Sequence, residues 1–154
     1  MTVSTGPPPT NPDTVFETAR VADAMSHALV SCTPETPLVG VAALMSRRRI
    51  HAVYVFDYGD DADVSPELWG LVSDLDLVAA ARAGLAGRTA AGSAVEPLVT
   101  VMSDDRLEHA AQLMAEHGTS HLAVLDSRTH RPAGVISTLD IARLLAESAD
   151  CGSS

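Results

Sequence analysis

Aromatic residues and cysteines are both scarce in this sequence, and each shortage excludes a class of protein. Phe, Trp and Tyr together make up 3% of the 154 residues, so the core has to be built from Val, Leu, Ala, Ile and Met. Such a core is typical of α/β layers, in which helices cover a sheet of branched residues. Two cysteines, Cys32 and Cys151, are too few for a disulfide framework or a zinc-ligand spacing. We therefore expect a cytoplasmic protein in a reducing compartment.

Long apolar runs and an excess of positive charge are also missing. No apolar run approaches the roughly 20 residues that span a bilayer, and residues 1–13 lack the basic and apolar regions of a secretory signal. The formal net charge is −10, so neither nucleic acid nor a membrane surface is an expected partner. The single basic run, Arg47-Arg48-Arg49, is more typical of a solvated helix end, although a local basic patch can still bind a small anion.

An internal repeat with an offset of 69 residues organises the chain. Residues 29–57 align with residues 98–126 without a gap, and eight positions are identical, including Leu38/Leu107 and Met45/Met114. The offset then falls to 64, so that Gly70 corresponds to Gly134. The first copy therefore holds a longer, acidic loop at residues 58–69. A surface loop absorbs an insertion at little cost, so the shift leaves the repeat intact.

Each copy shows the same order of elements, β-α-β-β-α. Its first helix has apolar residues at i, i+3, i+4 and i+7, which is the pattern of an amphipathic helix. The three strands of each copy are predicted at residues 28–32, 52–56 and 68–72, and at residues 97–101, 122–125 and 133–136.

A single unit of this length buries too little apolar surface to be stable alone. We therefore expect an α/β (α+β) fold in which two repeats, residues 18–85 and 86–148, pack with pseudo-twofold symmetry into one module. Residues 1–17 are predicted to be disordered and residues 149–154 to form a flexible tail.

A Gly-x-x-Ser-x-x-Asp element closes each repeat at a strand-to-helix junction, with Ser73 and Asp76 in the first copy and Ser137 and Asp140 in the second. One interpretation is structural: Ser at an N-cap and an acid three residues later form a capping box. The other is functional, because a helix N-terminus attracts phosphate and a carboxylate suits the two hydroxyl groups of a ribose. Both interpretations use the same geometry.

Taken together, the motifs resemble a tandem pair of cystathionine β-synthase (CBS) domains, often called a Bateman module. The resemblance covers about residues 21–147. It is carried by the segment 20–26 ending in Met-Ser, by the central-strand segments 50–57 and 119–126, and by the two Gly-x-x-Ser-x-x-Asp elements. Their order, spacing and duplication are together highly specific.

This resemblance implies a regulatory module that binds an adenosine-containing ligand such as AMP, ADP, ATP or S-adenosylmethionine. Ser73 and Asp76 would contact phosphate and ribose in one site, and Ser137 and Asp140 in the other. The resemblance places the remaining contacts, mostly to adenine, at the following positions: Val30, Ile50, His51 and Leu71 in the first copy, and Val99, Thr119, Ser120 and Val135 in the second. It also implies a homodimer, and a separate effector protein as the recipient of the signal.

The sequence departs from the family pattern at the central strand, where the usual Pro is replaced by Tyr54 and Ala123. Tyr54 either alters the pocket or fills the core. The longer acidic loop of the first copy disfavours phosphate if it folds over that cleft. An alternative function is a ligand-free dimerisation or docking module, in which the Ser-x-x-Asp elements act only as helix caps.

Other candidate residues carry weaker signals. His51 and His121 flank the central strands, where they either bind a ligand or hydrogen-bond to the backbone. Arg143, one turn after Asp140, either reaches a phosphate or faces solvent. His117 and His121 are four residues apart, but Gly118 ends the helix between them, so we expect no metal site. No nucleophile has an identifiable base partner, so the sequence predicts no enzyme.

Overall fold

The computed structural model describes residues 11–59, 67–94 and 98–152, and it contains two β-α-β-β-α units. The first unit consists of β1 (Ser31–Cys32), α3 (Leu38–Arg48), β2 (Ala52–Asp57), β3 (Glu67–Ser73) and α4 (Asp74–Ala83). The second consists of β4 (Thr100–Met102), α5 (Leu107–His117), β5 (His121–Leu125), β6 (Pro132–Ser137) and α6 (Thr138–Gly152). The predicted fold class and order of elements are confirmed.

The two sheets have the same topology and register. Each has the strand order one-two-three, with the first strand parallel and the third antiparallel to the central strand. Ser31 pairs with Tyr54 in the first sheet, and Thr100 pairs with Ala123 in the second, as the offset of 69 requires. A register shift follows Val55 in one sheet and Val124 in the other. The repeat therefore extends to the irregularities of the sheets.

The first strand of each repeat is shorter than predicted. Only two residues of the segment 28–32 form β1, and β4 begins at Thr100 rather than at residue 97; residues 95–97 lie outside the described part. Val30 still takes part in pairing, because its carbonyl accepts a hydrogen bond from the amide of Tyr54 at 2.9 Å. Ala28 and Leu29 are exposed, so no burial requires them to be extended in a sheet.

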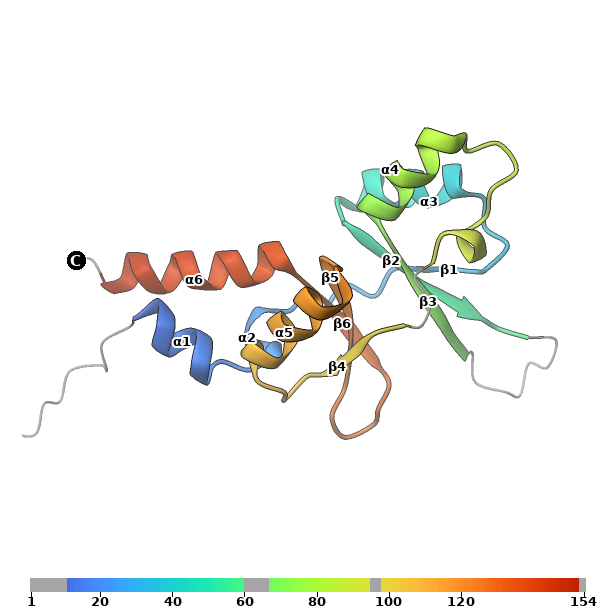
Figure 1. Cartoon of the computed structure of the whole chain (residues 1–154). Coiled ribbons are helices and arrows are strands. Elements are labelled where there is room, and N and C mark those ends of the chain that lie inside the picture. The colour runs from blue at the N-terminus through green and yellow to red at the C-terminus, as the bar shows by residue number, and fades with distance from the viewer. Residues whose placement is uncertain (1–10, 60–66, 95–97, 153–154) are drawn as a thin grey trace, which may run out of the picture.

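Three apolar clusters form the core. One lies under α3 and α4, a second lies under α5 and α6, and the third lies between the inner faces of the two sheets. Figure 1 shows the two sheets meeting near the centre of the molecule, with the helices of each repeat on its outer side. The repeats therefore share a core, as predicted from the small size of one unit.

Each repeat is completed by the segment that precedes the other repeat. The short helix α2 (Val21–Ala24) packs against α5 and α6, so Val21 and Met25 belong to the core of the second repeat. In the same way, the 3₁₀ turn η1 (Ala90–Gly92) places Ala90 in the core of the first repeat. Residues 18–26 fall within the predicted first repeat (residues 18–85), but in the structure they pack with the second.

Residues 19–28 and residues 88–94 each cross from one repeat to the other, and we call them the crossing segments. The two crossing segments make the same backbone hydrogen bonds. Ala19 accepts from the amide of Leu107 at 2.9 Å, and Arg88 accepts from the amide of Leu38 at 3.0 Å. Two further pairs of bonds follow the same offset of 69: the amides of Val21 and Ala90 donate to Asp105 and Thr36, and those of Ala22 and Ala91 donate to Ser103 and Pro34. Pseudo-twofold symmetry thus holds at the level of individual hydrogen bonds.

The prediction of disorder over residues 1–17 is wrong for residues 12–17, and residues 1–10 lie outside the described part. Helix α1 (Pro12–Thr18) has Asn11 as its N-cap, and the side-chain oxygen of Asn11 accepts a hydrogen bond from the amide of Asp13. Pro12 suits the first turn because an amide there would have no partner within the helix. Val15 and Phe16 pack on the core of the second repeat. Helix α1 lies beside α6, which extends to Gly152 and so continues into the predicted tail (Figure 1).

Tyr54 fills the core between the two sheets, which settles the choice left open by the sequence. Its side chain is 1% exposed and belongs to the cluster with Ala123, Leu71 and Val135. Its hydroxyl group donates a hydrogen bond to the carbonyl of Gly134 and accepts one from the amide of Val124 at 3.2 Å.

None of the helices in the described ranges is long and apolar enough to cross a membrane.

Candidate functional site

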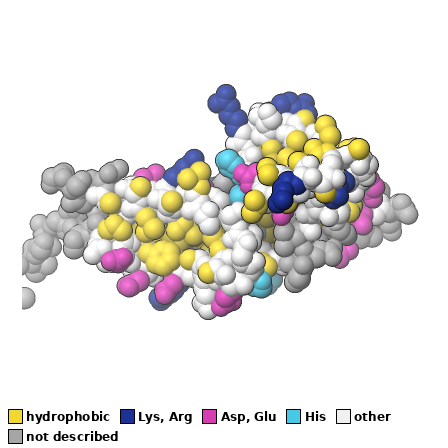
Figure 2. Space-filling view, turned by 45° about the horizontal axis from the view of Figure 1, so that its top comes forward, with side chains coloured by type: hydrophobic (Ala, Val, Ile, Leu, Met, Phe, Trp, Pro, Cys, Tyr) yellow, Lys and Arg dark blue, Asp and Glu magenta, His cyan; other side chains and the backbone are white. Residues whose placement is uncertain are grey.

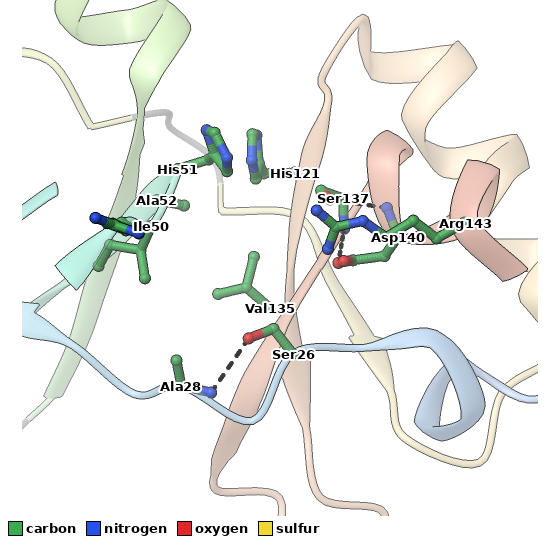
Figure 3. Close-up of a pocket in the computed structure, with 11 residues that line it drawn as sticks. Ser26, Ala28, Ile50, His51, Ala52, His121, Val135, Ser137, Asp140 and Arg143 are labelled. Atoms are coloured by element: carbon green, nitrogen blue, oxygen red, sulfur yellow. Dashed lines mark hydrogen bonds between the residues drawn. The ribbon is translucent and has the colours of Figure 1, made fainter. Parts of the chain in front are cut away.

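A cleft lies between the start of β2 in the first repeat and the end of β6 in the second. We call it the Ser137 cleft. The first repeat contributes Arg49, Ile50, His51 and Ala52, the second contributes His121, Val135, Ser137, Asp140 and Arg143, and Ser26 and Ala28 line it from the crossing segment. Figure 3 shows Ile50 and Ala52 on one side, Val135 on the other, and the two histidines next to each other. The cleft therefore combines apolar walls with polar groups.

Backbone pairing of the crossing segment holds one wall of the cleft in place. Ser26 and Val135 exchange two hydrogen bonds of 2.9 Å between their amides and carbonyls. Gly134 makes this approach possible, because a Cβ atom there would lie 2.0 Å from the Ser26 carbonyl oxygen and 2.6 Å from the Met25 methyl carbon. The glycine of the second motif is thus required by the crossing segment.

Ser137 and Asp140 form the N-cap of α6. The backbone amide of Ser137 donates to Oδ2 of Asp140 at 2.9 Å, and the amide of Asp140 donates to Oγ of Ser137 at 3.2 Å. Ser73 and Asp76 make the same two bonds at 2.8 and 3.2 Å at the start of α4. The predicted capping geometry is confirmed at both junctions, and it leaves Oδ1 of each carboxylate outside these bonds.

The two junctions differ in where the serine hydroxyl proton goes. Oγ of Ser73 donates to Oδ2 of Asp76 at 2.9 Å. Among the hydrogen bonds that join described residues, the Ser137 hydroxyl group donates none. Its proton is therefore available to an acceptor in the cleft, whereas that of Ser73 is engaged within its own cap.

Two histidines, one from each repeat, stand where the cleft meets a second pocket. His51 is exposed and its Nδ1 atom lies 3.0 Å from Oδ2 of Asp74, while Nδ1 of His121 lies 2.9 Å from Oγ of Ser120. The ring centroids are 6.4 Å apart. Burial lowers the pKa of His121 below its usual value of 6.5, an effect that the neighbouring carboxylate of Asp74 opposes. His121 is thus mostly neutral near pH 7.

The second pocket continues from the Ser137 cleft, because both are lined by His51, His121 and Ser137. It is further lined by Ser120, by the first residues of α6 and by Asp74. The two hollows together offer carboxylate, hydroxyl, imidazole and guanidinium groups next to apolar side chains. Such a mixture of apolar surface with a few convergent polar groups is typical of sites for small organic ligands.

The structure brings together some of the predicted site residues and separates others. Five line the Ser137 cleft, and they come from both repeats: Ile50, His51, Val135, Ser137 and Asp140. Ser120 lines the adjoining pocket. The remaining six are not among the residues that line either hollow: Val30, Leu71, Ser73, Asp76, Val99 and Thr119.

Two of those six are part of the apolar core. Leu71 is 4% exposed between the sheets, and Val99 packs on the core of the second repeat. Asp76 lines a different pocket, which it shares with Arg88 and Ser93. By the offset of 69, the counterparts of Ser26 and Ala28 are residues 95 and 97, so the corresponding cleft on the other side of the molecule lies partly outside the described residues.

Sequence reasoning missed Arg49, Ser26, Ala28 and Ala52 as lining residues. The sequence favours a solvated helix end for the whole basic run, and Arg47 and Arg48 do lie exposed in the last turn of α3. Arg49 follows the helix in a left-handed conformation and so lies beside Ile50 at the cleft.

Among the residues that the structure describes, no three His, Cys, Asp or Glu side chains lie close enough to hold a metal ion. Cys32 is buried, and burial raises the pKa of its thiol. It packs in the core of the first repeat, as a small apolar side chain would.

Comparisons with known proteins agree with this architecture. Among solved structures, the chain is similar to the CBS domain pair of protein MJ0100 in complex with 5′-methylthioadenosine and S-adenosyl-L-methionine (TM-score 0.71, 19% identity, 84% of this chain and 97% of that chain). It is also similar to Hypoxic Response Protein I with two coordinated zinc ions (TM-score 0.62, 24% identity, 81% and 98%). A third similar structure is the CBS domain of the bacterial CNNM/CorC family Mg²⁺ transporter (TM-score 0.68, 19% identity, 87% and 79%).

No curated protein sequence matches the chain. The sequence profile of the CBS domain, however, matches residues 21–83 and 93–147, one match for each repeat and more than half of the chain in total. Because the profile, the repeat and the topology agree, the chain belongs to the CBS domain family, and its two repeats form a CBS domain pair.

Proposed function

We propose that this protein is a regulatory module that binds an adenosine-containing ligand in the Ser137 cleft and passes the signal to a separate partner. It would act without catalysing a reaction. The observation that carries the proposal is the composition of the cleft. An apolar wall, a helix N-terminus with a serine hydroxyl group, and a carboxylate converge there from two repeats.

Each part of the cleft suits one part of such a ligand. Ile50, Ala52 and Val135 offer apolar surface to a flat base (Figure 3). Asp140 keeps Oδ1 outside its cap hydrogen bond, so that atom can accept a hydrogen bond from a ribose hydroxyl group. The dipole of α6 favours an anion near its N-terminus, where the amides of Thr138 and Asp140 already donate to Ser120 and Ser137 and that of Leu139 does not take part in these bonds.

The volume of the two adjoining pockets also suits an extended ligand that occupies both. The Ser137 cleft encloses about 150 Å³ and the adjoining pocket about 230 Å³. Ligand pockets usually measure roughly 300–1,000 Å³, so a nucleotide would extend over both. The solved CBS domain pair of protein MJ0100 holds two adenosine compounds, which supports this class of ligand.

A ligand in this cleft would touch both repeats at once, so its binding would favour one arrangement of the repeats over another. We further propose that the protein forms a homodimer through an exposed apolar surface of α3 and α4. Val39, Leu75 and Val78 on α3 and α4 are 60–61% exposed, and Figure 2 shows apolar side chains gathered over this part of the first repeat. Sedimentation of a Val78→Glu variant as a monomer, and of the wild type as a dimer, would support this surface.

The proposal is tested by a thermal-shift panel with AMP, ADP, ATP, S-adenosylmethionine and a GTP control. A ligand at 100 times its Kd adds about 2.7 kcal/mol to the free energy of unfolding, which raises Tm measurably. We expect a rise with adenosine compounds that is lost in Asp140→Ala and kept in Asp76→Ala. A flat response from well-folded wild-type protein, with every compound at millimolar concentration, would refute the proposal.

A ligand-free docking module remains the second candidate, and the closed caps favour it. Both Ser-x-x-Asp elements satisfy their own helix termini without any ligand. On that view Asp140→Ala and Asp76→Ala would each lower the free energy of unfolding by about 1 kcal/mol and change nothing else. The ligand panel therefore separates the two functions.

A further inference from the structure

The helices of the two repeats carry formal charges of opposite sign. We call the exposed side of α3 and α4 the first-repeat face, and the exposed side of α5 and α6 the second-repeat face. Helices α3 and α4 contain three arginines and two aspartates, whereas α5 and α6, through residue 149, contain one arginine and four carboxylates. With histidine neutral, the formal charge is therefore +1 on the first pair of helices and −3 on the second.

The difference is sharpest along α3 and α5, which occupy corresponding places in the two repeats. Each helix has an exposed row of three residues at a spacing of four, and the offset of 69 relates the two rows: Val39, Ala43 and Arg47 on α3, and Glu108, Gln112 and Glu116 on α5. Nε2 of Gln112 donates to Oε1 of Glu116 at 2.8 Å, so these side chains lie side by side on α5. An apolar and basic row in one repeat thus corresponds to an acidic row in the other.

Helix α1 adds to the negative charge of the second repeat. It contacts both α5 and α6, its Asp13 and Glu17 are exposed, and residues 12–18 contain no basic side chain. At the offset of 69, Asp13 corresponds to Arg82, and residues 81–87 contain no carboxylate. The two repeats therefore differ in the same direction at a second, independent place.

Both faces also expose apolar side chains, which is typical of protein interfaces. Val39, Leu75 and Val78 are 60–61% exposed on the first-repeat face, and Leu139 is 46% exposed on the second. Figure 2 shows dark blue arginine side chains beside the apolar ones over the first repeat. Asp74 and Leu139, at the starts of α4 and α6, line one pocket, so the two faces meet near the middle of the molecule.

We infer that the first-repeat face binds the second-repeat face of another copy of this chain, so that the two subunits of the homodimer are arranged head to tail. Two adjoining faces allow a closed twofold dimer, in which each face meets its complement on the other subunit. Opposite charges then attract at both contacts, whereas a head-to-head dimer would oppose like charges at both. This inference rests on the proposed homodimer and specifies how its subunits are arranged.

The salt dependence of dimerisation tests the arrangement with the unmodified full-length protein. Sedimentation equilibrium at increasing sodium chloride concentration gives the Kd of the dimer. In a head-to-tail dimer this Kd should rise with salt, because salt screens the attraction between the faces. In a head-to-head dimer it should fall, because salt then screens a repulsion. A falling Kd would overturn the inference.

Two charge reversals test the faces separately. Arg47→Glu gives the first-repeat helices a charge of −1, and Glu116→Arg reduces that of the second-repeat helices to −1. In a head-to-tail dimer both should raise the Kd, by roughly tenfold for Arg47→Glu because it makes both contacts repulsive. In a head-to-head dimer Glu116→Arg should instead tighten the dimer. Arg131→Glu, at an exposed position just before β6, is the control and should leave the Kd unchanged. Melting curves show whether each variant remains folded.

Cross-linking tests the arrangement without changing the charge of either face. In a Cys151→Ser background, chains with Ala43→Cys are mixed with chains with Gln112→Cys and treated with a flexible bismaleimide. Cys32 is buried and should not react. We expect cross-linked dimers from the mixture and none from the Ala43→Cys chains alone. Dimers cross-linked through two copies of residue 43, or none from the mixture, would contradict a head-to-tail arrangement.

The outcomes separate this inference from the proposals on which it rests. If the wild type sediments as a monomer up to millimolar concentration at every salt concentration, both the homodimer and its arrangement are wrong, and ligand binding in the Ser137 cleft is unaffected. If the wild type is a dimer that salt or Glu116→Arg tightens, the homodimer stands and the head-to-tail arrangement is wrong.

Discussion

Tyr54 links the two repeats through its hydroxyl group, which bonds to Gly134 and Val124 of the opposite sheet. Tyr54→Phe should leave a buried carbonyl and a buried amide without this partner. We expect the free energy of unfolding to fall by about 1–3 kcal/mol, measured by urea denaturation. Tyr58→Phe, at a half-exposed position, is the control and should have almost no effect. Equal stability of the two variants would mean that the hydroxyl group does not join the repeats.

His121 offers a prediction about pH. Burial lowers the pKa of its imidazole below 6.5, so folding favours the neutral form. The stability that it contributes is complete above about pH 6.5, the unfolded value, and is lost as the pH falls through the folded pKa. A histidine ring titration by NMR should place His121 below 6.5. A pKa of 6.5 or above would show that the neighbouring carboxylates outweigh burial.

At the scale of elements, the first crossing segment (residues 19–28) forms one wall of the cleft through the bridge between Ser26 and Val135. Gly134 allows this segment to approach β6. In Gly134→Ala the new methyl group would collide with the Ser26 backbone, which is part of a paired bridge and has little freedom to move. We expect a loss of about 1–3 kcal/mol in the free energy of unfolding. Gly92→Ala is the control, since a Cβ atom there meets nothing within 4 Å. A stable Gly134→Ala protein would contradict the observed approach of Ser26.

Element order and both capped junctions were predictable from the sequence, because helical periodicity, turn residues and the Ser-x-x-Asp spacing are local signals. The same offset of 69 relates the strand registers that the structure shows in the two sheets. Helix α1 was missed because Val15 and Phe16 are its only large apolar residues, too few to show a period. Arg49 was missed because a run of three arginines gives no indication of which one leaves the helix.

The packing of one repeat on the other was not predictable from a single copy. Nothing in the pattern of residues 19–25 states that they cover the second repeat rather than the first, because apolar spacing specifies a buried face and not its partner. The same limit applies to the cleft, where Ile50 of one repeat meets Ser137 of the other. Residue types were therefore predicted better than the pairs that they form.

At the scale of the whole molecule, the crossing segments make the two repeats depend on each other. A cut after Gly84 would separate Ala90 from the core of the first repeat, and Val21 from that of the second. We expect the fragments 1–84 and 85–154 to lack a cooperative thermal transition alone and to regain one when mixed, as followed by circular dichroism. Cooperative unfolding of either fragment by itself would show that one repeat is an independent domain.

The central claim is that one ligand contacts both repeats in the Ser137 cleft. Backbone amide chemical shifts recorded during a titration with AMP test it most directly. The account predicts simultaneous changes in two segments far apart in the sequence, residues 49–52 and residues 135–143, with little change at the exposed face of α3. Changes confined to one repeat, or none at a millimolar concentration of AMP, would contradict it.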